Sequence, residues 1–149
     1  MPLIQLTTFI KAPIDKVFDL ARSIDLHQDS MTAHSEKAIA GRQQGLIEKG
    51  ETVTWMAKHV GKERKLKVII TAMNKPHSFA DEMLEGDFAK MKHEHFFKQC
   101  ENGTIMIDQF YFSSPYGIVG KLANHFFLTA YMTRLLEKRN QHLKAAAEL

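Results

Sequence analysis

Two histidines and one aspartate are the residues of this chain whose types and spacing could do chemistry. His93 and His95 lie two positions apart in "MKHEHFFKQC", and Asp108 follows in "TIMIDQFYF". An imidazole titrates near neutral pH, and a carboxylate beside it can fix its orientation, so a His–Asp pair can act as a general acid or base. We therefore regard His95 and Asp108 as candidate catalytic residues for an aldol-type cyclisation or a dehydration.

The same two histidines could serve other purposes. Residues i and i+2 of a strand share a face, so His93 and His95 could ligate a metal together, with Asp108 as a third ligand. No HExxH or paired CxxC motif accompanies them, and we therefore predict no metal and no cofactor. Two further interpretations stay open: interior histidines bonded to Asp108, a tyrosine or the backbone, or histidines that contact a bound ligand.

The alternation of residues along 88–99 predicts which way these side chains point. One face carries Lys90, Lys92, Glu94 and Lys98, so it faces water, and the histidines face inward. The dipeptide Asn102-Gly103 favours a two-residue hairpin turn. That turn would pair Phe97 with Asp108 and His95 with Phe110, and directly opposite residues share a face. Asp108 is therefore expected on the inner face, diagonal to His95.

Two other hairpins complete the predicted inner face. A turn at Val60-Gly61 pairs Trp55 with Leu66 and Val53 with Val68, with His59 and Arg64 near the rim. The strand over 78–85 is ambiguous, because a turn at Lys75-Pro76 puts Phe79, Asp81 and Met83 inside, whereas one at Gly86-Asp87 puts Ala80, Glu82 and Leu84 inside. We prefer the first arrangement, because an aromatic ring suits a core better.

The remaining segments predict an α+β fold. A strand over 3–11 is followed by a helix that begins at Pro13, a second short helix at "IDLHQDSM" and a short strand at "HSEKAIAG". From 117 to about 146 the chain predicts one long helix whose first half is apolar on nearly every side, so that half should be covered on more than one side. A curved antiparallel sheet that grips this helix would often leave a cavity between the two.

The order of these elements resembles the helix-grip, START-like superfamily, also called SRPBCC or Bet v 1-like. "FIKAPIDKVFDLA" is similar to the opening strand and helix of that superfamily, while "HSFADEMLEGDFAKMKHEHFF" and "GTIMIDQFYF" resemble a bacterial subgroup described as polyketide cyclase/dehydrase-like or cell-division-inhibitor-like. The resemblance implies a curved seven-stranded antiparallel sheet, two short helices after the first strand, a long C-terminal helix and a hydrophobic cavity. Members bind lipids, sterols, polyketides or hormones, and some are enzymes. A fold does not fix a function.

Composition limits the classes of protein to which the chain can belong. At 149 residues with 44% hydrophobic and 25% charged residues, the chain suits one globular domain over 1–149. The net charge of +3 is scattered, which argues against nucleic acid. A single cysteine, Cys100, and no apparent signal peptide favour a cytoplasmic protein. The longest charge-free apolar run, 122–133, is too short to span a bilayer, so we expect no integral membrane association.

These observations favour a binding protein for a hydrophobic or amphipathic small molecule (lipid, polyketide or isoprenoid-like) over an enzyme. An apolar pocket with a few convergent polar groups is the usual form of such a site. The predicted ligand-binding residues are Trp55, His59, Leu66, Val68, Asp81, His93, His95, Phe97, Asp108, Phe110, Phe126 and Ala130. The alternatives are a cyclase/dehydrase-type enzyme that uses the His–Asp pair, and a non-catalytic interaction protein with a filled core. We also consider a homodimer formed through an exposed strand edge or a helix face.

Overall fold

Seven antiparallel strands form one sheet in the order β1-β7-β6-β5-β4-β3-β2. The computed structural model describes residues 3–113 and 118–149, with side chains for 3–113 and 126–149. The strands are β1 (Leu3–Ile10), β2 (Lys37–Gly41), β3 (Thr52–His59), β4 (Lys62–Asn74), β5 (Ser78–Glu85), β6 (Lys90–Cys100) and β7 (Gly103–Ser113). Because each strand after β2 pairs with the next one in the chain, β2 to β7 form a meander and β1 closes beside β7.

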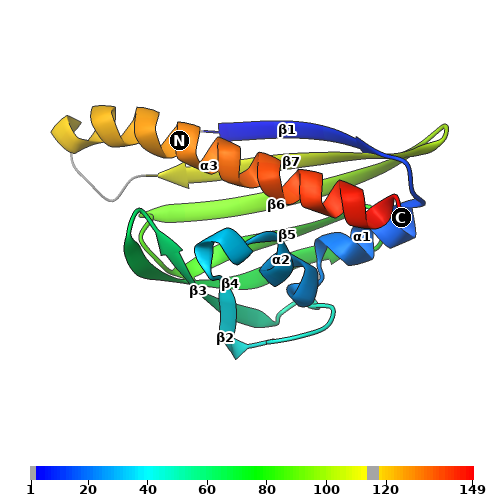
Figure 1. Cartoon of the computed structure of the whole chain (residues 1–149), viewed down its shortest axis with the longest axis horizontal. Helices are drawn as coiled ribbons and strands as arrows, with labels where there is room; N and C mark the ends of the chain where they lie inside the picture. The colour runs from blue at the N-terminus through cyan, green and yellow to red at the C-terminus, as the bar shows by residue number, and fades with distance from the viewer. Residues whose placement is uncertain (1–2, 114–117) are drawn as a thin grey trace.

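The helices lie on one face of this sheet. They are α1 (Ile14–Ala21), α2 (Ile24–Ser30), the short 3₁₀ helix η1 (Thr32–His34) and α3 (Ile118–Ala147). α3 runs obliquely over β1, β7 and β6, and α1 and α2 lie beside it (Figure 1). Pro13 is the N-cap of α1 rather than its first residue, and Ser23 caps α2 by accepting a hydrogen bond from the Leu26 amide at 3.1 Å. The predicted helix-grip, α+β architecture is confirmed.

The β6–β7 hairpin differs from its predicted register by two residues. Cys100 pairs with Gly103 and His95 pairs with Asp108, so the turn is Glu101-Asn102 and Asn102 takes the positive φ of 69°. Gly103 lies in the strand instead, where a Cβ atom would stand 2.3 Å from the carbonyl oxygen of Ile10. A shift of two residues keeps every side chain on its predicted face, and Asp108 therefore still points inward.

In the two earlier hairpins, β3–β4 and β4–β5, the side chains lie on the predicted faces. The first hairpin has the predicted pairs, and the second has irregularities in its register. In β3–β4 the predicted pairs Trp55–Leu66 and Val53–Val68 both occur. In β4–β5 the register shifts twice, between Lys67 and Val68 and between Ile70 and Ala72. These irregularities accommodate a loop at each end of β5, and they leave Asp81 opposite His93 on the inner face.

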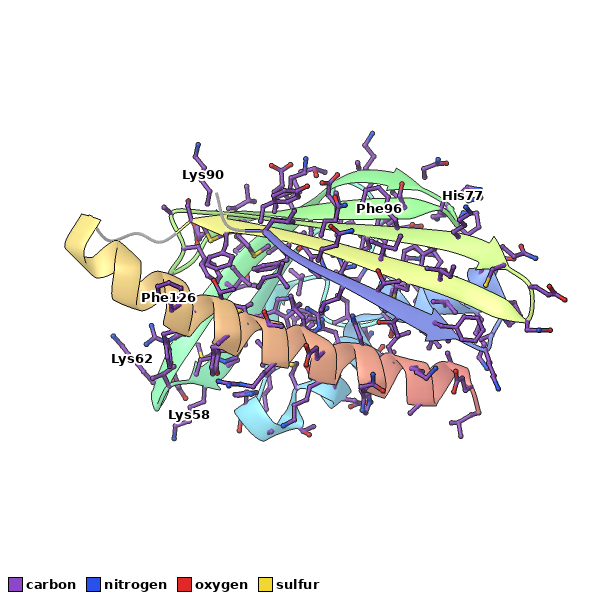
Figure 2. The ribbon with its side chains drawn as sticks, turned by 90° about the horizontal axis from the view of Figure 1, so that it is seen from above. Lys58, Lys62, His77, Lys90, Phe96 and Phe126 are labelled. Atoms are coloured by element: carbon purple, nitrogen blue, oxygen red, sulfur yellow. The ribbon has the colours of Figure 1, made fainter. Side chains whose placement is uncertain are left out.

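The core forms where α1 packs on the inner face. Phe18 of α1, 1% exposed, meets Phe79 and Phe97 edge-on with ring centres 5.6 and 5.3 Å apart. The opposite face of the sheet carries charged side chains together with exposed apolar ones, and Lys90 and Phe96 point from it away from α3 (Figure 2). The core therefore lies entirely between the sheet and the helices.

The expectation that the whole first half of α3 is covered is wrong for the residues whose side chains are described. Phe126 is 71% exposed and Phe127 is 49% exposed. Phe126 lies on the same side of the molecule as the tip of the β3–β4 hairpin, marked by Lys58 and Lys62 (Figure 2). Gly117, the predicted start of the helix, and the side chains of 118–125 lie outside the described residues. Among the described residues, no helix is long and apolar enough to cross a membrane.

Candidate functional site

A cavity of about 400 Å³ lies between the inner face of the sheet, α2 and α3. Its wall is mainly apolar, with Val53, Ile70 and Met91 from the sheet and Leu128 and Met132 from α3. The volume falls within the range of small-molecule pockets, roughly 300–1,000 Å³. Eight of the twelve predicted ligand-binding residues line the cavity: Trp55, His59, Leu66, Val68, Asp81, His93, His95 and Phe110.

Exposed lining residues mark the mouth of the cavity. Val60 at the tip of the β3–β4 hairpin is 61% exposed, and the side chain of Asp87, after β5, is 60% exposed. Asp87 accepts a hydrogen bond from Arg64 at 2.9 Å. His59 and Tyr131 hydrogen-bond at 2.7 Å between β3 and α3. The mouth therefore lies between the β3–β4 hairpin, the β5–β6 loop and the first half of α3.

Four aromatic rings, three of them stacked, form one wall of the cavity. Phe79 stacks on His95 with ring centres 4.1 Å apart, and His95 stacks on His93 at 3.8 Å. Phe110 meets His93 edge-on at 5.3 Å. The imidazoles are 3% and 5% exposed, for His93 and His95, so their orientation is fixed by packing as well as by hydrogen bonds.

Two carboxylates hold the imidazoles from opposite sides. Asp108 Oδ1 lies 2.8 Å from His93 Nε2 and 3.3 Å from His95 Nδ1. Asp81 Oδ1 lies 3.0 Å from His95 Nε2. The amide of Asn140, from α3, donates to Asp108 Oδ2 at 2.7 Å. His95 therefore has a carboxylate at each ring nitrogen, whereas His93 has one.

This arrangement separates the protonation states of the two histidines. Burial alone would lower the pKa of His95, but its hydrogen bonds to Asp108 and Asp81 outweigh burial and raise that pKa above its usual value. Burial, followed by the charge of His95, lowers the pKa of His93 to about 4. Burial would raise the pKa values of Asp108 and Asp81, but hydrogen bonds from the histidines lower both. The ionised carboxylates thus favour the protonated form of His95, whereas His93 is neutral near pH 7.

The neutral His93 has one ring nitrogen to offer. Its Nε2–H donates to Asp108, which leaves Nδ1 with its lone pair. Among the described residues Nδ1 has no hydrogen-bond partner, and it is not fully buried, so it retains contact with the cavity that His93 lines. His93 is therefore the histidine that can accept a hydrogen bond or a proton from a bound molecule. His95, the histidine predicted for that role, has both nitrogens engaged.

A second polar group lies across the cavity on α2 and α3. His27 stacks on Trp55 with ring centres 4.2 Å apart, and its Nε2 lies 2.5 Å from Glu36 Oε1. Burial, and then the charge of Arg139, lower the pKa of His27. Arg139 is half-buried and lines the cavity, and within the described part of the chain its guanidinium makes no hydrogen bond or ion pair. Arg139 can therefore donate to a bound molecule.

Four predicted ligand-binding residues do not line the cavity. Phe97 is buried under α1, and Asp108 lies behind the two imidazoles, which separate it from the cavity. Phe126 and Ala130 are exposed on α3. Each is two residues from Leu128, about 200° around a helix, so neither shares its inner face.

The residues that the sequence interpretation missed are Arg139, Tyr131, His27 and Glu36. The inner stripe of α3 runs through Leu128, Met132, Leu135 and Arg139, at the helical spacing of i, i+4, i+7 and i+11. This spacing was available in the sequence and would have pointed to Arg139. No comparable signal marks His27 or Glu36, because α2 is short and Glu36 lies in a connection.

Chemically, the site offers hydrogen bonding, proton transfer at His93 and metal ligation. Within the described residues, Asp81, His93 and His95 each place a ligand atom within 4.8 Å of the other two. The strands β5 and β6 hold these three side chains next to the apolar wall.

Known proteins resemble this chain in three-dimensional structure. No protein-family model matches the chain, and no curated protein matches it. Among solved structures, the chain is similar to TTHA0849 from Thermus thermophilus, with a TM-score of 0.76 and 19% identity over 98% of this chain and 99% of that one. It is also similar to ginseng major latex-like protein 151 from Panax ginseng, with a TM-score of 0.70 and 15% identity over 98% and 97%.

A third similar structure is the di-domain ARO/CYC StfQ from the steffimycin biosynthetic pathway. The TM-score is 0.80 with 8% identity, over 98% of this chain and 50% of that one. At these identities the likeness shows that the chain has the helix-grip fold.

Proposed function

We propose that this protein binds a hydrophobic or amphipathic small molecule in the cavity between the sheet and α3. The observation that carries the proposal is a mostly apolar cavity of about 400 Å³ with hydrogen-bonding groups at separate places on its wall. A filled-core interaction protein does not fit such a cavity.

The polar groups indicate what kind of molecule suits the site. His93 Nδ1 offers an acceptor on β6, and Arg139 offers donors on α3. Trp55 and Val68 add apolar surface to the same cavity. A molecule with a hydroxyl group at one end and a carbonyl or ether oxygen at the other would satisfy both groups. A purely aliphatic molecule would leave the half-buried guanidinium without a partner, which costs binding free energy.

Binding of a neutral apolar fluorophore tests the proposal. N-phenyl-1-naphthylamine should bind the wild-type protein in a 1:1 ratio with enhanced emission. Ala57, 5% exposed, lines the cavity, so Ala57→Phe should fill part of it and weaken binding at least tenfold. Ala72 is exposed on the opposite face of the same sheet, and Ala72→Phe is the matched control. Equal affinity in all three proteins would place the dye outside the cavity and defeat the proposal.

Catalysis is a second candidate because of the geometry at His93. A neutral imidazole whose Nε2–H is fixed by a buried carboxylate and whose Nδ1 contacts the cavity has the arrangement of a general base. A dehydration would release a product lighter than the bound molecule by one water. Asp108→Asn should stop that change in mass and leave binding largely intact, because Asp108 does not contact the cavity. In a pure carrier, the recovered molecule keeps its mass with either protein.

A further inference from the structure

We propose that Asp81, His93 and His95 form a binding site for a divalent first-row transition-metal ion at the wall of the cavity. This inference goes beyond the proposed function and needs no organic ligand in the cavity. It also departs from the sequence-based expectation of no metal, which rested on the absence of a known motif. The third ligand comes from a different strand than expected, Asp81 on β5 instead of Asp108 on β7.

The backbone brings the three side chains to one place. His93 and His95 are two residues apart on β6, so they share the inner face, and Asp81 is the direct cross-strand partner of His93. Their ligand atoms all lie within 4.8 Å of one another. Around a tetrahedral Zn²⁺ with ligand distances near 2.0–2.1 Å, neighbouring ligand atoms stand about 3.3 Å apart. Small rotations of the side chains would therefore close the site without moving the strands.

The hydrogen bonds assign the atom that each histidine would use. Asp108 Oδ1 occupies His93 Nε2 and lies beside His95 Nδ1. The remaining nitrogens are His93 Nδ1, which contacts the cavity, and His95 Nε2, which lies 3.0 Å from Asp81 Oδ1. Asp108 thus lies at one nitrogen of each imidazole. The other nitrogen of each ring lies on the Asp81 side, and the proton that His95 Nε2 shares with Asp81 would leave when the ion binds. This carboxylate–histidine arrangement is the usual support of a metal-bound histidine, since it fixes the ring and raises its basicity.

The supports behind the ligands are also rigid. Asn140 donates to the second oxygen of Asp108 at 2.7 Å and so holds the carboxylate in place. Phe79 stacks on His95 with ring centres 4.1 Å apart, and Phe110 meets His93 edge-on at 5.3 Å. A site whose ligands are held by buried partners in an apolar surround needs little reorganisation to bind an ion.

The donor set indicates the class of ion. Two imidazole nitrogens and one carboxylate oxygen suit Zn²⁺, Fe²⁺ or Co²⁺ better than Mg²⁺ or Ca²⁺, which prefer oxygen ligands throughout. Asp81 and Asp108 together carry two negative charges, which match a divalent cation. Three protein ligands leave a coordination position for a water molecule or for an oxygen of a molecule in the cavity.

Zinc titration of the full chain tests this proposal. We expect EDTA-treated protein without an affinity tag to bind one tight Zn²⁺ by isothermal titration calorimetry. Asp81→Asn, which keeps the side-chain shape, should weaken binding by more than the ten- to hundredfold typical of losing an outer support. His142→Ala removes an exposed histidine of α3 and should leave the tight site unchanged. Crystals of the wild-type protein grown with Zn²⁺ should show one anomalous peak bonded to Asp81, His93 Nδ1 and His95 Nε2.

Each opposing result would overturn the proposal. These results are the absence of stoichiometric binding, wild-type affinity in a folded Asp81→Asn protein, and an anomalous peak only at another histidine pair such as His34 and His59, whose rings stack at 4.7 Å. If Asp81→Asn does not fold, the anomalous map of the wild-type protein decides the question alone. Zinc binding and fluorophore binding are separate measurements, so failure of one proposal is distinguishable from failure of the other.

Discussion

His93 Nε2 lies 2.8 Å from Asp108 Oδ1, and both side chains are almost fully buried, at 3% and 2% exposure. The carboxylate thereby keeps the proton of the neutral His93 on Nε2, which directs Nδ1 toward the cavity. Asp108 does not touch the cavity itself. Its role is to position the two imidazoles. Asp108 therefore contributes to the stability of the site, whereas other residues contact a ligand.

Asp108→Asn should destabilise the protein strongly. The substitution leaves His95 beside one carboxylate instead of two and removes a charged acceptor from a buried network. Breaking such a buried pair costs about 3–5 kcal/mol, and we expect a loss near the lower end because the shape is kept. Asp19→Asn is the control, because Asp19 is 49% exposed in its ion pair with Arg22 and should cost less than about 1 kcal/mol. Guanidinium unfolding measures the loss of unfolding free energy in both variants. Equal losses would show that the buried network stabilises the protein no more than the exposed ion pair does.

Arg139→Met should separate binding from stability. The substitution keeps the apolar stem of a side chain that makes no hydrogen bond or ion pair to the residues described in the structure. We therefore expect the free energy of unfolding to change by less than about 1 kcal/mol, whereas affinity for an oxygen-bearing natural ligand should fall about tenfold. Arg134→Met, at an exposed position of α3, is the matched control and should change neither. Unchanged ligand affinity in Arg139→Met would remove Arg139 from the site.

Stability should depend on pH through His27. Burial lowers the pKa of His27, so below the ordinary histidine pKa of about 6.5 the unfolded chain binds a proton that the folded chain does not. The free energy of unfolding should therefore fall as pH decreases from about 7.5 to about 5.5, and His27→Gln should make this fall shallower. His142→Gln, at an exposed position, should keep the wild-type slope. A slope in His27→Gln as steep as in the wild type would contradict the assignment.

Gly103→Ala tests the register of the β6–β7 hairpin. An added Cβ would stand 2.3 Å from the Ile10 carbonyl oxygen, a backbone atom that cannot move without disturbing β1. We expect a loss of about 2–3 kcal/mol or more, whereas Glu101→Ala, at an exposed turn position, should change stability by less than about 0.5 kcal/mol. If Gly103 were a turn residue, as the Asn-Gly pair suggests, the added methyl group would meet open space and the cost would be smaller.

Much of this fold could be predicted from alternation alone. The pattern of β6 predicts His93 and His95 inside, and the charges on the opposite face support that interpretation. The predicted turn lies one residue too late because Asn-Gly is a local signal, whereas the position of Gly103 depends on β1, which is far away in the chain. The error left every side chain on its predicted face, since it moved the register by two residues.

The site was less predictable than the fold. Parity could not choose between the two arrangements of β5, because the choice depends on irregularities in β4 that no residue pattern announces. Phe126 is apolar but exposed. The apolar composition of the helix suggested that it would be buried, whereas its angular position, away from the inner face that Leu128 marks, places it outside. The pairing of His27 with Glu36 joins a helix to a connection, and only the folded chain brings them together. A homodimer and a cytoplasmic location stay predictions of the sequence.

Native mass spectrometry of the freshly purified protein tests the central claim, that the cavity holds a small molecule, most directly. Wild-type protein and Ala72→Phe should carry an excess mass, either as purified or after incubation with a metabolite extract of the source cells. The excess should disappear on denaturation and be absent from Ala57→Phe. A wild-type protein that shows only the mass of the bare chain under every one of these conditions would contradict the claim.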